Sequence, residues 1–156
     1  MKKTDPTLIE QAGDWKGALP NIQQLVEQSC EAVADHLQFS RCYTLAVVLA
    51  DDPFIQQLNA QFRGKDAPTN VLSFPADDEE GAELGDIILS LDTLAREAQA
   101  EQKELAAHCI HLVVHGVLHL LGYDHMQDDE AEEMEALEVA ILAQLGIASP
   151  YESDYV

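Results

Sequence analysis

The stretch HGVLHLLGYDH, residues 115–125, places three histidines in a Leu-rich segment of helical pattern and interrupts that pattern with a glycine. Residues four apart on an α-helix lie about 40° apart around the axis and roughly 6 Å along it, so His115 and His119 can share one ion. Gly122 can adopt the left-handed conformation that ends a helix, which turns His125 back toward them. Three neutral nitrogens and an open position are typical of catalytic zinc. The stretch therefore predicts one Zn²⁺ per chain, bound by His115, His119 and His125.

The alternative is that these histidines only line a helix face, as a single histidine commonly does. The spacing HxxxHxxGxxH, with the turn glycine in place, favours the metal site. His108 and His111 lie two turns and one turn earlier near the same face, and we expect them to orient the ligands or simply to pack.

The spacing of ligands and glycine is similar to that of the metzincin proteases, HExxHxxGxxH, but Gly116 stands where those proteases have a glutamate. Without that general base, ordinary proteolysis is disfavoured. A glycine inside a helix costs about 1 kcal/mol relative to alanine. Two reasons for Gly116 stay open, namely close packing against a sheet and room for a substrate near the metal.

The whole chain suits one globular domain over residues 1–156, since 47% of its 156 residues are hydrophobic. Its apolar runs are shorter than the roughly 18 residues of a membrane span, and its first residues lack the apolar core of a signal peptide. We therefore expect a cytoplasmic protein without a membrane partner. The cysteines are odd in number and widely spaced, which favours buried, reduced thiols at Cys30, Cys42 and Cys109.

Local patterns predict helices mixed with strands in the first half and helices alone in the second. Asn21 can cap a helix over residues 22–37. Asp52 as the N-cap and Pro53 as the first helical residue can begin another helix, which ends at Gly64 and has Phe54, Ile55, Leu58 and Phe62 facing inward. Strands are expected over residues 43–50, 70–74 and 86–90, with a weaker candidate at 7–11, and helices over 94–102, 105–121 and 129–145. The predicted fold is α+β, with a single small mixed sheet packed with helices.

The charge is extreme, with 8 Lys and Arg against 29 Asp and Glu and a net charge of −21. Residues 76–86 and 126–138 hold six and seven acidic residues without Lys or Arg, whereas residues 53–75 carry only Arg63, Lys65 and Asp66. The acidic runs can be solvated segments or a docking face for a basic partner. Taken alone, the net charge argues against binding nucleic acid, but residues 53–75 form a slightly positive region.

The segments FRGKDAPTNVLSFP (62–75), LGDIILS (84–90) and HLVVHGVLHLLGYDH (111–125), followed by DDEAEEMEALE, resemble the YbeY family of bacterial metal-dependent endoribonucleases. The resemblance covers roughly residues 49–151. It implies an α+β metallohydrolase-like fold, zinc on the three histidines, and Arg63 as a residue important for activity. It also implies cleavage of single-stranded RNA in 3′-end maturation of 16S ribosomal RNA and in ribosome quality control.

Chemistry agrees with that implication, because zinc can activate water and polarise a phosphoryl oxygen without a neighbouring carboxylate base. Arg63 offers a planar donor fork for a phosphate, although it could instead cap its helix or pair with Asp66; Lys65 is a weaker candidate. The nucleophile, a zinc-activated water or the 2′-hydroxyl of the RNA, stays open.

Two other functions compete with the endoribonuclease, namely another zinc hydrolase such as a peptidase or amidase, and a ribosome-assembly binding protein with a non-catalytic zinc. Because so acidic a protein should bind naked RNA weakly, we expect a basic ribosomal protein or assembly factor to present the substrate on the ribosome.

Overall fold

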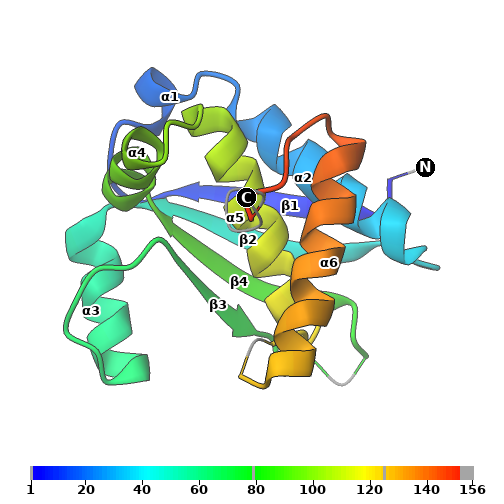
Figure 1. The fold of residues 1–156 in the computed structure, drawn as a ribbon. Helices are drawn as coiled ribbons and strands as arrows, with labels where there is room; N and C mark the ends of the chain where they lie inside the picture. Colours follow the sequence, from blue (N-terminus) through cyan, green and yellow to red (C-terminus); the bar gives the residue numbers. More distant parts are fainter. Residues whose placement is uncertain (1, 79, 125, 152–156) are drawn as a thin grey trace.

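A four-stranded mixed sheet forms the centre of the computed structural model, which describes residues 2–78, 80–124 and 126–151 (Figure 1). The strand order is β1-β2-β4-β3, with β2 parallel to both β1 and β4, and β3 antiparallel to β4. The strands are β1 (Thr4–Glu10), β2 (Tyr43–Ala50), β3 (Val71–Pro75) and β4 (Glu83–Ser90). The predicted α+β fold with one small mixed sheet is confirmed.

Helices cover this sheet, and their positions agree with the sequence pattern to within a few residues. The described residues form α1 (Trp15–Ala18), α2 (Ile22–Leu37), α3 (Asp52–Arg63), α4 (Leu91–Ala100), α5 (Leu105–Leu120) and α6 (Asp128–Gln144). The single-turn α1 was not predicted, because four residues are too few for a helical period to be recognised. None of the helices among the described residues is both long and apolar enough to cross a membrane.

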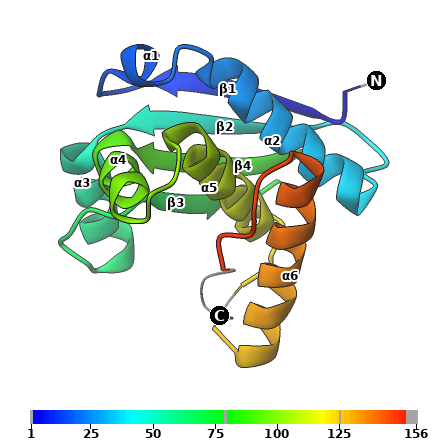
Figure 2. The ribbon, with the colours of Figure 1, turned by 45° about the horizontal axis from the view of Figure 1, so that its top comes forward.

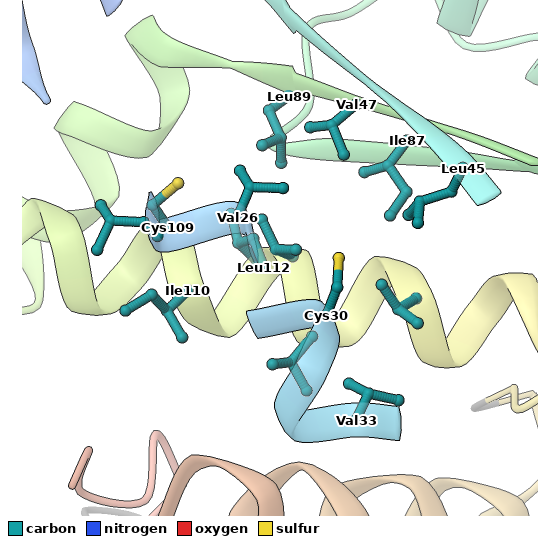
Figure 3. Packing of buried hydrophobic residues seen from close by; sticks show 14 of the residues in the cluster. Val26, Cys30, Val33, Leu45, Val47, Ile87, Leu89, Cys109, Ile110 and Leu112 are labelled. Carbon is teal, nitrogen blue, oxygen red and sulfur yellow. The ribbon is translucent and has the colours of Figure 1, made fainter. Parts of the chain in front are cut away.

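The main core lies between one face of the sheet and the helices α2 and α5, which run across that face (Figure 2). Alternate β2 residues, Leu45 and Val47, point toward Val26 and Cys30 of α2 and toward Leu112 of α5 (Figure 3). The intervening β2 residues face the other side, where α3 packs. From Leu45 to Ala50, β2 is apolar without interruption and none of its residues is exposed, because both faces of this part of the strand are covered.

A smaller cluster of Ala50, Ile55, Leu72 and Ile88 packs between α3 and the opposite face of the sheet. The inward face predicted for α3 is only partly right. Ile55 is fully buried, but Phe62 is 55% exposed, although its ring packs edge-on against Phe74 of β3. Gly64 ends the helix in the left-handed conformation, as predicted.

The predicted start of α3 is wrong by one residue. Asp51 is the N-cap, and its carboxylate accepts a hydrogen bond from the Phe54 N–H at 3.1 Å. Asp52 lies in the first turn, where its carboxylate accepts hydrogen bonds from Ser90 and Thr93, each at 2.6 Å. The two adjacent aspartates are equivalent in the sequence pattern, and only their tertiary partners distinguish them.

Two further local predictions need correction. Asn21 occupies the N-cap of α2, but its side chain makes no capping hydrogen bond. Cys30 and Cys109 are buried, and burial raises the pKa of each thiol to about 12, whereas Cys42 is exposed. The exposed position of Cys42 follows from its place in the loop before β2, outside the core.

Helix α5 approaches the sheet closely at Gly116. A Cβ atom at this position would lie 3.1 Å from two side-chain atoms of Ile87 in β4. Of the two reasons considered for this glycine, close packing against the sheet is the one that the structure supports. Beyond α5, Gly122 has a φ of +100°, the left-handed conformation that the sequence predicts for a chain reversal.

Candidate metal centre

Two of the predicted ligands, His115 and His119, face each other on α5. Their Nε2 atoms are 3.0 Å apart, and both side chains are half-buried. Two nitrogens bound at 2.0–2.1 Å to one tetrahedral zinc ion would be separated by about 3.3 Å. The helix therefore brings two ring nitrogens close to the separation that a shared ion requires.

A buried carboxylate on α6 lies behind the first of these rings. Glu138 is 1% exposed, and its Oε1 is 2.6 Å from Nδ1 of His115. Its other oxygen, Oε2, is 3.0 Å from Nε2 of His111 and 2.5 Å from the Tyr151 hydroxyl. Helix α6 packs beside α5, so this carboxylate reaches the histidines from a different element (Figure 1).

Glu138 is ionised in this environment. Burial alone would raise its pKa, but hydrogen bonds from His111 and His115, the charge of His115 and the Tyr151 hydroxyl hold the pKa at about 2. An ionised carboxylate only accepts hydrogen bonds, so Nδ1 of His115 carries the hydrogen. When the His115 ring is neutral, its other nitrogen, Nε2, therefore carries the lone pair that could bind a metal ion. This nitrogen faces His119.

These contacts fit a metal site. The ligand atoms of His111, His115 and Glu138 lie within 4.8 Å of one another, so these three side chains could hold a metal ion. This set shares His115 with the predicted ligands but contains His111 and Glu138 in place of His119 and His125. A carboxylate that accepts the Nδ1 hydrogen of a histidine is also the usual partner of a metal-binding imidazole, because it fixes the tautomer and orientation of the ring.

His108 and His111 lie near the site, as predicted. His111 contacts Glu138, which also contacts His115, so His111 helps to hold the orienting carboxylate. His108 is 4% exposed, and its Nε2 is 2.9 Å from Glu97, which places it in a separate polar contact between α5 and α4. Of the roles considered, orientation fits His111 and packing fits His108.

The third predicted ligand, His125, lies outside the described residues. The chain reversal that precedes it is described, since the Tyr123 N–H donates to the Leu118 carbonyl at 3.0 Å and Gly122 is left-handed. The assignment of His125 as a ligand stays a prediction of the sequence.

Arg63 is the last residue of α3 and is exposed. Its Nη2 donates to the Ser73 carbonyl at 2.8 Å, and its guanidinium lies over the Phe74 ring, with Cζ 5.1 Å from the centroid. The ion pairs found among the described residues do not include a pair between Arg63 and Asp66. Asp66 instead accepts from the side chain of Gln56 at 3.0 Å.

One residue of β3 links Arg63 to α5, which carries the predicted ligands His115 and His119 and which we call the metal helix. The Ser73 carbonyl accepts from Arg63, and the Ser73 hydroxyl donates to the Gly116 carbonyl at 3.2 Å. Gly116 directly follows His115. The edge strand β3 therefore fixes the arginine and the histidines relative to each other.

Glu138 and Tyr151 were missed by the sequence reasoning. Glu138 belongs to the acidic run of residues 126–138, for which the sequence suggested either a solvated segment or a docking face. It nevertheless follows Met134 by four residues and precedes Leu142 by four, and both neighbours are buried. A carboxylate in the buried stripe of a helix is the signal that could have identified it. Tyr151 carries no comparable signal.

Comparison with known proteins places the chain among established relatives. The family model described as endoribonuclease YbeY matches residues 10–146. Proteins named endoribonuclease YbeY include one from Parvibaculum lavamentivorans, 44% identical over 95% of this chain and 85% of its own length. Another, from Sinorhizobium medicae, is 45% identical over 97% of this chain and 96% of its own.

A third relative of the same name, from Paramagnetospirillum magneticum, is 59% identical over 69% of this chain and 70% of its own length. Among solved structures, the solution structure of TM1509 from Thermotoga maritima matches with a TM-score of 0.57 and 25% identity. That match covers 90% of this chain and 91% of the other. The extent of these matches shows that the chain belongs to the endoribonuclease YbeY family.

Proposed function

We propose that this chain is a zinc-dependent endoribonuclease that cleaves phosphodiester bonds of single-stranded RNA in the cytoplasm. Its role would lie in 3′-end maturation of 16S ribosomal RNA and in ribosome quality control. The observation that carries the proposal is that Ser73 of β3 contacts both Arg63 and α5. On α5, the rings of His115 and His119 face each other, so an arginine and a candidate metal site are held in a fixed relation. The name shared by the relatives supports the same activity.

The ligands proposed for one zinc ion are His115, His119 and His125. Glu138 would orient the His115 ring by accepting its Nδ1 hydrogen, so that Nε2 faces the ion. When bound, zinc would supply a Lewis acid that activates water and polarises a phosphoryl oxygen. Neutral nitrogen ligands suit this task because they leave the positive charge of the ion largely uncompensated.

Arg63 is the residue proposed to contact the scissile phosphate. Its Nη2 donates to the Ser73 carbonyl and its guanidinium lies over the Phe74 ring, and these two contacts limit the orientations of an otherwise flexible side chain. The remaining N–H groups can donate to phosphate oxygens, and they would stabilise the charge that grows there during cleavage.

A peptidase is less well supported. Extended peptides commonly bind by adding a strand to a free sheet edge. Strand β3 is such an edge, but its Ser73 carbonyl already accepts from Arg63. Gly116 also stands where the related protease signature has its glutamate base.

Cleavage assays with matched variants test the proposal. Purified protein with measured zinc content is given single-stranded RNA and, separately, a peptide library. Arg63→Ala should lower RNA cleavage by about 100- to 1,000-fold without loss of zinc, because it removes donors to the transition state. His119→Ala should lose both zinc and cleavage. Arg63→Lys should recover little, since lysine keeps the charge but lacks the planar fork.

Three results would contradict the proposal. Undiminished RNA cleavage in both Arg63→Ala and His119→Ala would mean that a contaminating nuclease is being measured. Cleavage of peptides but not of RNA would support a peptidase. Ribosome binding without cleavage of either substrate, in protein that contains zinc, would support a non-catalytic assembly factor.

The proposed partner on the ribosome is a basic ribosomal protein or assembly factor that docks on the start of α6. The first turn of α6 carries Asp128, Asp129 and Glu130, and the exposed Glu132 and Glu133 follow. Such a face would attract a basic surface and thereby bring RNA to a protein whose own net charge of −21 repels it.

Neutralising these five residues to Asn or Gln should weaken ribosome association and leave the zinc content unchanged. Because acidic residues also stabilise a helix start, the helical content of the variant must be checked by circular dichroism. A control variant should neutralise five exposed acidic residues elsewhere, namely Asp5, Glu10, Asp35, Asp77 and Glu104. Equal association of wild type and the α6 variant, or equal loss in both variants, would contradict docking at this face.

A further inference from the structure

A groove of about 390 Å³ lies on the face of the sheet opposite the metal helix, beside the end of α3. We call it the aromatic groove. Its lining consists of apolar residues of α3 and of the adjoining strands together with one acidic residue, namely Val48, Phe54, Leu58, Phe62, Phe74 and Ile88 with Asp86. The groove exists because α3 covers only part of this face.

Phe62 is the most exposed apolar residue that lines the aromatic groove, with 55% of its surface exposed. Its ring packs edge-on against Phe74, with centroids 5.4 Å apart and an interplanar angle of 68°. This contact holds the Phe62 ring in place while leaving much of it open to solvent. An aromatic ring that is fixed and exposed is suited to receive another flat ring.

Positive charge borders the same groove. The Arg63 guanidinium lies over the Phe74 ring, which lines the groove, whereas the exposed Asp86 contributes one negative charge to the lining. Lys65, two residues after Arg63 in the sequence, is also exposed. Residues 53–75 carry two basic residues and one acidic residue in a chain of net charge −21, so the cation and the aromatic ring coincide in a slightly positive segment. Aromatic rings beside basic side chains are the usual means of binding single-stranded nucleic acid.

The groove and the metal centre meet across one edge strand. Consecutive β3 residues point to opposite faces of the sheet, so Ser73 contacts Gly116 of the metal helix while Phe74 lines the groove. Arg63 contacts both Ser73 and Phe74. An RNA strand whose phosphate is held by Arg63 would therefore have a neighbouring nucleotide beside the groove.

We propose that the aromatic groove binds a base of the single-stranded RNA, stacked on Phe62, next to the phosphate held by Arg63. The inference rests on the proposed endoribonuclease function and adds a base-binding site to it. Recognition is through stacking and depends little on sequence, since every base has an aromatic face.

A double-mutant cycle between protein and RNA tests the proposal. A short single-stranded RNA is prepared with one abasic site, moved along the sequence position by position, and its affinity for the zinc-loaded protein is measured. With the wild type, one position should be far more sensitive than its neighbours. Phe62→Ala should weaken binding of the intact RNA by about five- to a hundredfold. When the RNA is abasic at the sensitive position, Phe62→Ala and the wild type should bind it with equal affinity, because the base that stacks on Phe62 is already missing.

Two matched variants make the result specific. Phe62→Trp should retain affinity, since it preserves a stacking surface, and Ile9→Ala should have no effect because Ile9 is an exposed apolar residue of β1, at the far edge of the sheet. Salt gives a second readout. Lys65→Ala should reduce the slope of log affinity against log salt concentration, whereas Phe62→Ala should lower affinity without changing that slope.

Three outcomes would overturn the base-binding site. If the losses of binding free energy caused by Phe62→Ala and by the abasic site were additive, Phe62 and the missing base would not be in contact. A loss of ribosome association in Phe62→Ala, with unchanged affinity for naked RNA, would make the groove a protein interface. If Phe62→Ala bound every RNA with full affinity, the groove would not bind a base, even if the protein cleaved RNA as proposed.

The opposite combination separates the two proposals. If Phe62→Ala and the abasic site were coupled but the protein cleaved no RNA, the proposed nuclease activity would be wrong and the base-binding site would stand.

Discussion

Glu138 connects the packing of α6 to the chemistry of α5. It is a buried anion with hydrogen bonds from His111, His115 and Tyr151. Carboxylates of this kind are costly to bury, and they are retained where their charge orients a functional group. Here the group is the His115 ring, whose Nε2 is directed at His119 by the hydrogen bond on the other side of the ring.

Replacing Glu138 with glutamine should weaken zinc binding by about 10- to 100-fold, because the neutral amide no longer fixes the His115 tautomer. The affinity can be measured by competition with a chromophoric chelator. Glu132→Gln, on the exposed side of the same helix, serves as the control and should bind zinc as the wild type does. Wild-type affinity in Glu138→Gln would show that the carboxylate does not act on the metal site.

The same residues show what sequence can and cannot reveal about the site. Spacing alone predicted that His115 and His119 face each other, because both lie on one regular helix. Glu138 reaches them from another helix, and no local pattern encodes the packing of α6 against α5. Phe62 was expected to face inward for the same reason, since a helical period identifies an apolar stripe but not what covers it.

At the level of elements, the distance between α5 and the sheet depends on a glycine. Gly116→Ala would gain about 1 kcal/mol in helix propensity, but the new Cβ would lie 3.1 Å from the fully buried Ile87. We expect a net loss of about 1–2 kcal/mol in the free energy of unfolding, measured with urea. Ile87→Val should cost less in the Gly116→Ala background than alone, since it removes one crowded methyl group. Additive losses, or a more stable Gly116→Ala, would contradict this packing.

Asp52 joins three elements, because residues of α3, β4 and α4 meet at its carboxylate. Burial alone would raise its pKa, but hydrogen bonds from Ser90, Thr93 and Arg96 outweigh burial and lower it. The Arg96 ion pair measures 2.9 Å. A carboxyl whose pKa is lower in the folded state stabilises the fold above its ordinary pKa of 3.8, and it loses this contribution as the pH falls through the folded value.

Asp52→Asn should therefore reduce the free energy of unfolding by about 1–3 kcal/mol at pH 7. The difference from the wild type should shrink as the pH is lowered below about 4, because the carboxyl of the unfolded chain then takes up a proton, whereas the folded carboxyl does so only at a lower pH. Urea unfolding at several pH values measures this difference, with the exposed Asp35→Asn as the control. A difference that is constant from pH 7 to pH 3 would mean that the charge of Asp52 is not what stabilises the junction.

Elements were easier to predict from sequence than their exact ends. Helix α5 combines a strong apolar period with a stop glycine, and β2 is a short β-branched run between turn residues, so both were located within a residue. The start of α3 was placed one residue late because Asp51 and Asp52 are equally good caps locally. Contacts with β4 and α4 decide between them, and such contacts are not encoded in a local window.

Across the whole molecule, charge is distributed unevenly along the chain. The acidic start of α6 and the slightly positive region of residues 53–75, which contains Arg63, belong to different elements. An acidic protein can then act on RNA if the substrate arrives at this region, in the proposed arrangement with the help of a basic partner.

Metal binding should be coupled to the stability of the entire chain. That residues 1–156 form one domain is a prediction of the sequence, and its test is a single cooperative unfolding transition. Zinc at about 100 times its dissociation constant would add about 2.7 kcal/mol to the free energy of unfolding, which raises Tm by about 5–10 °C in a protein of this size.

Calorimetry with and without a chelator measures that shift. His119→Ala should abolish it while Ile9→Ala retains it, because only the first removes a proposed ligand. If two transitions appear and zinc moves only one, the metal helix would belong to a unit that folds separately from the rest. An ion that binds only the native state must stabilise it. If zinc leaves the Tm of the wild type unchanged, His115 and His119 therefore face each other for a reason other than metal binding.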